Sequence, residues 1–204
     1  MNQALSQQSR QELLANPALQ GLEPFESAYT HTPYLQDVGQ KYSRKMVDSL
    51  QEAVQRVGLK DGMTISFHHG YREGDRTINS VVQVLADMGF KNLTLAASSL
   101  MSCNTPLIEH IKSGVIRRIY TSGMRGKLAE AISNGLMEEP VHIHSHGGRA
   151  HLIQTGEINI DVAFLGVSAC DEFGNANGVN GKSRCGSLGY AKVDAHFALS
   201  LIHI

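Results

Sequence analysis

Three histidines alternate with other residues between positions 142 and 146, and two glycines and an arginine follow them. Imidazoles spaced two apart share one face of a strand, so His142, His144 and His146 could bind zinc, hold an anion or move a proton. Zinc needs a further ligand, and no cysteine or carboxylate stands beside the run. We therefore expect no metal, and predict His144 and His146 as catalytic residues, with structural hydrogen bonding as the alternative. The predicted substrate-binding residues of this segment are Gly147, Gly148 and Arg149.

A second group of polar residues and glycines follows the apolar run 63–67. Two glycines let the backbone approach a ligand, a helix N-terminus offers free N–H groups to an anion, and Arg72 adds a fixed positive charge. The alternative is an ordinary strand–helix turn in which Asp75 caps the helix. The predicted substrate-binding residues of this loop are His68, His69, Gly70, Arg72, Gly74 and Asp75.

Two further loops carry candidate ligand-binding residues. Gly123 and Gly126 flank Arg125, an arrangement that suits a clamp for a carboxylate or phosphate, although a surface arginine in a turn fits equally well. The segment 168–190 is rich in glycine and asparagine and is long for a loop, which favours a functional role. The predicted substrate-binding residues of these loops are Ser98, Ser99, Gly123, Arg125 and Asn175.

Short apolar runs alternate with stretches of helical periodicity along the chain. The strands expected from this pattern are 63–67, 93–97, 116–120, 141–144 and 162–165, and the helices are 46–57, 76–88, 106–112, 127–134 and 150–155. Strand and helix alternate in steps of roughly 25 residues, which predicts an α/β domain with a mostly parallel sheet flanked by helices. Ligands bind beyond the carboxyl ends of such strands, where the candidate loops begin.

The composition excludes several classes of partner. The 204 residues carry 18 Lys+Arg and 19 Asp+Glu, which leaves no basic surface for nucleic acid or an anionic membrane. The sequence has neither an apolar run long enough for a membrane span nor a signal peptide, so we expect a cytoplasmic protein. Its three cysteines lack metal-ligand or disulfide spacing and are interpreted as free thiols. Only 18% of the residues are charged, a weak indication of a protein partner.

Several blocks of sequence closely resemble the α subunit of bacterial citrate lyase. These blocks are residues 61–69, 89–96, 143–149, 159–166, 170–178 and 185–191. The resemblance runs almost without gaps from about residue 41 to residue 194. More distantly, the chain is similar to an α/β half-domain of the acyl-CoA transferases.

This resemblance implies a citrate CoA-transferase that exchanges acetate for citrate on the thioester of an acyl-carrier protein. The carrier bears a phosphoribosyl-dephospho-CoA prosthetic group, so the chain would bind no cofactor directly and would act on that arm or on CoA thioesters. The implied partners are the β subunit and the acyl-carrier γ subunit of citrate lyase, together with citrate and acetate, in an oligomer. The exchange would proceed through a mixed anhydride without a covalent enzyme thioester.

Two departures from the family pattern define the expected domains. Residues 1–40 predict an N-terminal arm, 41–194 a CoA-transferase-like half-domain, and 195–204 an atypical tail produced by truncation or a frameshift. Family members are more than twice this length and contain a second, similar half. The alternatives are therefore an inactive binding or assembly module of the lyase complex, or an acyl-CoA transferase with a covalent carboxylate nucleophile.

Overall fold

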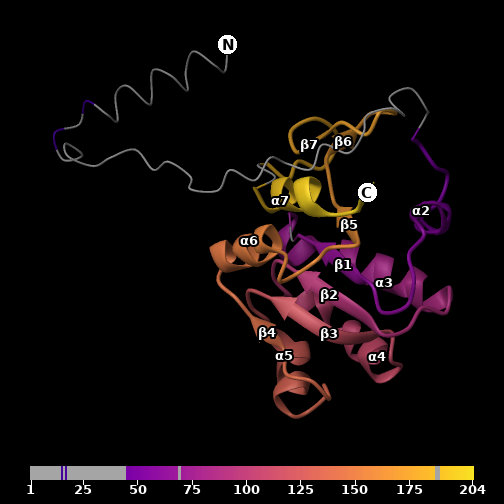
Figure 1. The fold of residues 1–204 in the computed structure, drawn as a ribbon, viewed down its shortest axis with the longest axis vertical. Coiled ribbons are helices and arrows are strands. Elements are labelled where there is room, and N and C mark those ends of the chain that lie inside the picture. Colours follow the sequence, from indigo (N-terminus) through magenta and orange to yellow (C-terminus); the bar gives the residue numbers. More distant parts are fainter. Residues whose placement is uncertain (1–14, 16, 18–44, 69, 187–188) are drawn as a thin grey trace. The chain divides into compact units, whose positions relative to one another are not determined.

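The protein contains a parallel six-stranded sheet (Figure 1). The computed structural model describes residues 15, 17, 45–68, 70–186 and 189–204, and all elements below belong to the unit that begins at Pro33. The strands of the sheet are β1 (Thr64–Phe67), β2 (Leu93–Ala97), β3 (Ile116–Thr121), β4 (His142–Ile143), β5 (Val162–Leu165) and β8 (Ser200–His203). A separate antiparallel hairpin consists of β6 (Ala169–Cys170) and β7 (Ala176–Asn177).

Helices alternate with these strands, and glycines in the left-handed conformation end several of them. The α-helices are α2 (Leu50–Val57), α3 (Thr77–Asp87), α4 (Leu107–Lys112), α5 (Gly126–Ser133), α6 (His146–Thr155) and α7 (Gly189–Phe197). Two short 3-10 helices, η3 (Arg72–Gly74) and η4 (Ser102–Asn104), lie after β1 and β2. The described helices include none that is long and apolar enough to cross a membrane.

The strand order places β1 inside the sheet. The order is β4-β3-β2-β1-β5-β8, and every neighbouring pair is parallel. From β1 the chain builds outward through β2, β3 and β4, and then crosses to the other side of β1 to form β5 and β8. The predicted α/β fold with a mostly parallel sheet flanked by helices is therefore confirmed.

Successive side chains of the central strand enter different cores, because a strand alternates its faces. Ile65 and Phe67 join the larger apolar cluster, which includes residues of α2, α3, α4 and α5. The Phe67 ring stacks on Phe164 of β5 with ring centroids 5.3 Å apart. The smaller cluster lies under α6 and α7, which pack beside each other in Figure 1. Ser66 belongs to this second face and is fully buried.

Three expectations need correction. The helix predicted at 150–155 begins four residues earlier, at His146, because Ser145 caps it. The predicted boundary at residue 194 falls inside α7, and the residues assigned to an atypical tail form the end of α7 and the paired strand β8. The long segment 168–190 contains the hairpin β6–β7. The arm predicted at 1–40 lies outside the described residues, apart from two positions.

Candidate functional site

A cavity of about 350 Å³ lies beyond the carboxyl end of β1. Its lining residues are His68, Gly70, Arg72, His146, Cys185, Gly189 and Tyr190. From β1 the chain continues to β2, toward one edge of the sheet, whereas from β5 it continues to β8, toward the other edge. Open parallel sheets bind ligands at such a change of direction between neighbouring strands. Within the described part of the chain, the cavity lining contains no carboxylate. With an arginine and two histidines in its lining, the cavity therefore suits an anion.

The loop after β1 forms one wall of the cavity. A Cβ added at Gly70 would lie 3.2 Å from the His68 ring and 3.4 Å from the Cys185 Cβ, so glycine permits this close packing. Arg72 has a φ of 53°, in the left-handed region that disfavours residues with a Cβ. The chain thus holds a positive side chain at the cavity in a strained backbone conformation.

Asp75 orders the end of this loop. One carboxylate oxygen accepts a hydrogen bond from the Thr77 N–H at 3.0 Å, and the other accepts one from the Tyr71 N–H at 3.3 Å. Asp75 is 5% exposed and holds the Thr77 N–H at the start of α3, but the N-cap position is Arg76, one residue later than the sequence predicts. Gly74 ends η3 with open space around it, and His69 lies outside the described residues.

His68 follows β1 directly and is 7% exposed. Its Nε2 atom has no hydrogen-bond partner among the described residues. Burial lowers the pKa of His68 below 6.5, whereas the negative charges of Asp194 and Asp75 partly oppose this effect. The ring is consequently neutral at pH 7, and a neutral imidazole has a nitrogen that can accept a hydrogen bond or a proton.

Helix α6 brings His146 to the cavity. The Ser145 hydroxyl accepts a hydrogen bond from the Gly148 N–H at 2.9 Å, which fixes the first turn. The His146 ring lies 5.3 Å from the Tyr190 ring of α7. Because first-turn N–H groups lack partners within a helix, the N–H groups of His146 and Gly147 are available near the cavity.

His142 and His144 lie outside the cavity lining. Their rings stack with Tyr120 of β3, with centroids 4.6 Å (Tyr120–His142) and 6.0 Å (Tyr120–His144) apart. Burial lowers the pKa of His144, and the neighbouring His142 adds to the shift. The described residues contain no group of three His, Cys, Asp or Glu side chains that could hold a metal ion. The catalytic role assigned to His144 stays a prediction.

The loops after β2 and β3 are hydrogen-bonded to each other. The Ser99 hydroxyl donates to the Gly123 carbonyl at 3.4 Å, and the Ser98 carbonyl accepts from the Ser122 N–H at 3.3 Å. Arg125 is exposed at the start of α5. None of the predicted binding residues of these loops belongs to the cavity lining, and their roles stay predictions.

Arg149 is placed in the core of the domain. Its side chain is 2% exposed and pairs with Asp194 of α7, which is fully buried. Arg149 is not among the lining residues of the cavity, and its substrate-binding role stays a prediction. Asn175 is also engaged, since its amide donates to the Asp171 carboxylate at 2.8 Å.

Sequence reasoning overlooked three residues of this region: Cys185, Tyr190 and Asp194. Tyr190 and Asp194 are four residues apart and therefore share a face of α7. That spacing was the available signal for these two residues.

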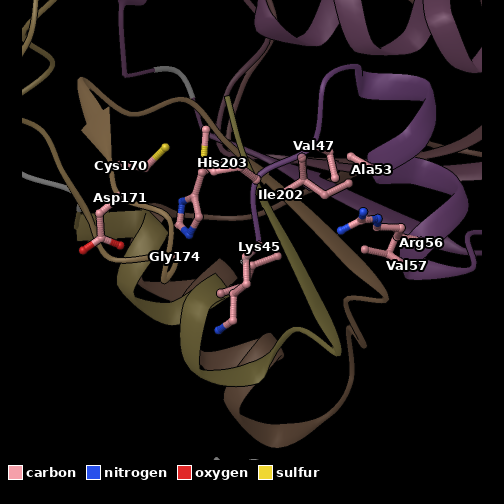
Figure 2. Close-up of a pocket in the computed structure, with 12 residues that line it drawn as sticks. Lys45, Val47, Ala53, Arg56, Val57, Cys170, Asp171, Gly174, Ile202 and His203 are labelled. Atoms are coloured by element: carbon pink, nitrogen blue, oxygen red, sulfur yellow. The ribbon is translucent and has the colours of Figure 1, made fainter. Parts of the chain in front are cut away.

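A second cavity of about 280 Å³ shares no lining residue with the first (Figure 2). Lys45, Arg56 and His203 contribute its basic groups. Figure 2 shows apolar residues such as Val47 and Ile202 beside them. Burial lowers the pKa of His203. Of its lining residues, Cys170, Asp171 and Gly174 belong to the segment 168–190, for which the sequence favours a functional role, but none was predicted as a site residue.

Comparisons with known proteins give a consistent family. The curated citrate lyase alpha chains of Klebsiella pneumoniae and Escherichia coli (strain K12) are 58% and 57% identical to this chain over 202 and 205 residues. Each alignment covers 99% of this chain, but 39% and 40% of the respective relative. The chain therefore spans about two fifths of the length of these relatives.

A solved structure from Streptococcus mutans is similar in fold. It is described as the alpha subunit of citrate lyase in complex with citrate, is 47% identical, and has a TM-score of 0.78. The match covers 89% of this chain and 33% of that one. The family described as citrate lyase, alpha subunit (CitF) matches residues 43–204, including the helix end and strand that we expected to depart from the pattern. The chain belongs to the citrate lyase alpha subunit family.

Proposed function

We propose that this chain supplies the citrate-binding part of an acyl exchange, in which acetate is replaced by citrate on the thioester of an acyl-carrier protein. The observation that carries the proposal is the cavity at the end of β1. Its lining contains Arg72, His146 and His68, whose Nε2 atom has no described hydrogen-bond partner, and it contains no described carboxylate. Family membership supports it, and so does the similar Streptococcus mutans protein, which is described as bound to citrate.

The proposed chemistry consists of two acyl transfers. A citrate carboxylate attacks the acetyl thioester carbonyl, the C–S bond breaks, and the thiolate leaves with its electron pair. The thiolate then attacks the citryl carbonyl of the mixed anhydride, and acetate departs. The charges balance at each step, so the site needs positive charge and N–H donors rather than a redox group.

Three residues of the cavity lining have roles suited to this exchange. Arg72 offers a guanidinium that can pair with a citrate carboxylate in a bidentate manner. His146 and the N-terminus of α6 offer N–H donors to a second carboxylate or to the oxyanion. Neutral His68 accepts a hydrogen bond from the citrate hydroxyl, which distinguishes the hydroxy acid from acetate.

Acetate release tests the proposal. The 204-residue chain is mixed with acetyl-carrier protein and the β subunit, with and without citrate, and the Klebsiella pneumoniae alpha chain serves as the positive control. We expect acetate release only when citrate is present. Release that is indifferent to the citrate concentration would overturn the substrate assignment.

The short length of the chain favours one alternative, an assembly module without turnover. It spans 39% of the Klebsiella pneumoniae relative, and residues beyond that span can complete a site. Calorimetry with citrate and a pull-down with the carrier protein separate the two functions. Citrate binding supports the proposed site even if turnover requires the longer relative, whereas carrier binding without citrate binding supports the assembly module.

A covalent carboxylate nucleophile is disfavoured by the cavity lining, which contains no described Asp or Glu. Hydroxylamine releases an acyl group from an enzyme anhydride or thioester. After incubation with the acetyl thioester alone, we expect no hydroxylamine-sensitive label on the chain. A stoichiometric label would support the covalent mechanism instead.

A further inference from the structure

A buried ionic network lies between the sheet and the two helices that hold His146 and Tyr190. The Arg149 Nη1 atom donates to one Asp194 oxygen at 3.1 Å, and Nη2 donates to the other at 3.2 Å. The Ser66 hydroxyl of β1 donates to Asp194 at 2.7 Å and accepts from Arg149 at 2.7 Å. The Ala96 carbonyl of β2 accepts a further bond from Arg149 at 3.3 Å. Four elements, α6, α7, β1 and β2, therefore meet at one guanidinium.

This network touches the wall of the cavity through Tyr190. The Arg149 Cζ atom lies 5.5 Å from the centre of the Tyr190 ring, in a cation–π arrangement. The same ring packs against His146, which begins the helix that carries Arg149. Both rings line the cavity, whereas Arg149 and Asp194 do not.

The network also faces the opposite wall, where His68 lies two residues after Ser66. The charged groups that act on His68 are Asp194 from α7, Asp75 from the loop before α3, and Arg149 from α6. The two carboxylates favour the imidazolium and Arg149 disfavours it, so the Arg149–Asp194 pair presents opposing charges to His68.

We propose that Arg149 and Asp194 are positioning residues of the cavity, which hold the Tyr190 and His146 rings on one wall and balance the charge beside His68 on the other. This inference rests on the proposed function for the identity of the ligand, but its geometric part does not depend on citrate. A purely structural salt bridge would stabilise the domain but would leave ligand affinity unchanged in a folded Arg149→Lys variant.

Two variants that each remove one charge of the pair should shift the pKa of His68 in opposite directions if the proposal holds. Arg149→Met leaves the Asp194 charge unbalanced, so the pKa of His68 rises. Asp194→Asn leaves Arg149 unbalanced, so the pKa of His68 falls. The double variant Arg149→Met/Asp194→Asn gives a pKa of His68 between those of the two single variants, and it keeps the test available if Arg149→Met does not fold. Histidine Cε1 resonances followed by NMR report these values, with His68 assigned from a His68→Gln sample.

Arg149→Lys separates position from charge. A lysine keeps the positive charge but cannot make the paired contact with Asp194, so the pKa of His68 stays near its original value. We expect citrate to bind roughly tenfold more weakly, a loss typical of residues that support a site without touching the ligand. Lys112→Met is the matched control, because it removes one charge from the exposed Lys112–Glu109 pair and should change neither quantity.

The results distinguish the two proposals. If the pKa of His68 is unchanged in the single variants, or shifts in the same direction in both, the positioning role is wrong. Unchanged citrate affinity in Arg149→Lys would also overturn it. If the unmodified chain fails to bind citrate while His68 shifts in opposite directions, the network stands as inferred and the proposed ligand is wrong.

Discussion

Arg72 combines backbone strain with a place in the cavity lining. Its left-handed φ costs a residue with a Cβ about 1–2 kcal/mol relative to glycine. Gly70 and Gly74 lie two residues before and two residues after Arg72, so a glycine at position 72 would also fit this loop. The strained arginine at the cavity is consistent with the citrate contact proposed for it.

Replacing Arg72 with glycine or alanine separates the ligand contact from the strain. Both variants should lose citrate affinity by about 2 kcal/mol, or roughly 30-fold, because both lack the charged donor. Arg72→Gly should be about 1 kcal/mol more stable than Arg72→Ala, because alanine keeps the left-handed strain. Calorimetry and urea unfolding measure the two effects. Arg56→Ala, in the second cavity, is the control and should leave citrate binding intact; equal losses in Arg56→Ala and Arg72→Ala would contradict the assignment.

The sequence indicated the residues of this loop better than it indicated the role of Arg149. His68, Gly70 and Arg72 directly follow a predicted strand, and the rule for parallel sheets places them at its carboxyl end. Because Arg149 follows a histidine run, it was predicted to bind an anion. Its burial depends on Asp194, 45 residues later, and local pattern cannot reveal a partner at that separation.

Helix α6 illustrates how a cap can override weak helix propensity. Gly147 and Gly148 disfavour a helix, and the alternating histidines before them indicated a strand or a loop. The Ser145 hydroxyl nevertheless satisfies the Gly148 N–H, and the helix begins at His146. By contrast, β2 and β5 were predicted with the bounds that the structure has, because their apolar runs are buried on both faces.

The cap of α6 should matter for the site as well as for stability. Ser145→Ala removes the bond to Gly148 and should lower the free energy of unfolding by about 1 kcal/mol. It should also weaken citrate binding several-fold, because His146 begins that turn. Ser49→Ala is a matched control, since Ser49 caps α2 through the Glu52 N–H in the same way. If both variants bind citrate equally, the first turn of α6 does not contribute to the cavity.

At the scale of the whole molecule, imidazoles in several elements have their pKa lowered by burial. They are His68, His110, His144 and His203. The unfolded chain then binds more protons than the folded chain as the pH falls through 6.5. The free energy of unfolding is consequently larger at pH 7.5, and it declines as the pH falls toward the lowered pKa values of these histidines in the folded chain.

Urea unfolding at pH 7.5 and pH 5.5 should therefore give a smaller free energy of unfolding at the lower pH. Each imidazole that is charged only in the unfolded chain contributes up to about 1.4 kcal/mol per pH unit. The double variant His68→Gln/His110→Gln should show a shallower decline over the same interval. A stability that rises on acidification would show that the buried histidines are charged in the folded state.

The outer edge of the sheet at β8 predicts self-association. Leu199 and Ile204 flank this strand and are 64% and 47% exposed, and an edge strand with apolar neighbours favours pairing with other chains. Sedimentation of the purified chain should detect oligomers, and Leu199→Lys should reduce them. Ile143→Lys, on the two-residue strand at the opposite edge, is the control and should have little effect. A monomer at all concentrations would contradict this prediction.

The strand β8 was not expected from the sequence, although the sheet around it was. Ser200–His203 follows α7 after a short turn, and four residues with two apolar side chains give a weak strand signal. Its pairing with β5 depends on tertiary contacts, which a short segment cannot reveal by itself.

The buried Arg149–Asp194 pair also sets an order of events during synthesis. At about 5–20 residues per second, the ribosome adds Asp194 roughly 2–9 s after Arg149. A buried arginine without its carboxylate would cost about 3–5 kcal/mol, so we expect α6 to pack on the sheet only after Asp194 has been added. The nascent chain can therefore assemble β1 to β4 while the helix that carries Arg149 stays in solvent. The cavity wall made by His146 and Tyr190 is completed only after α7 has brought Asp194 to Arg149.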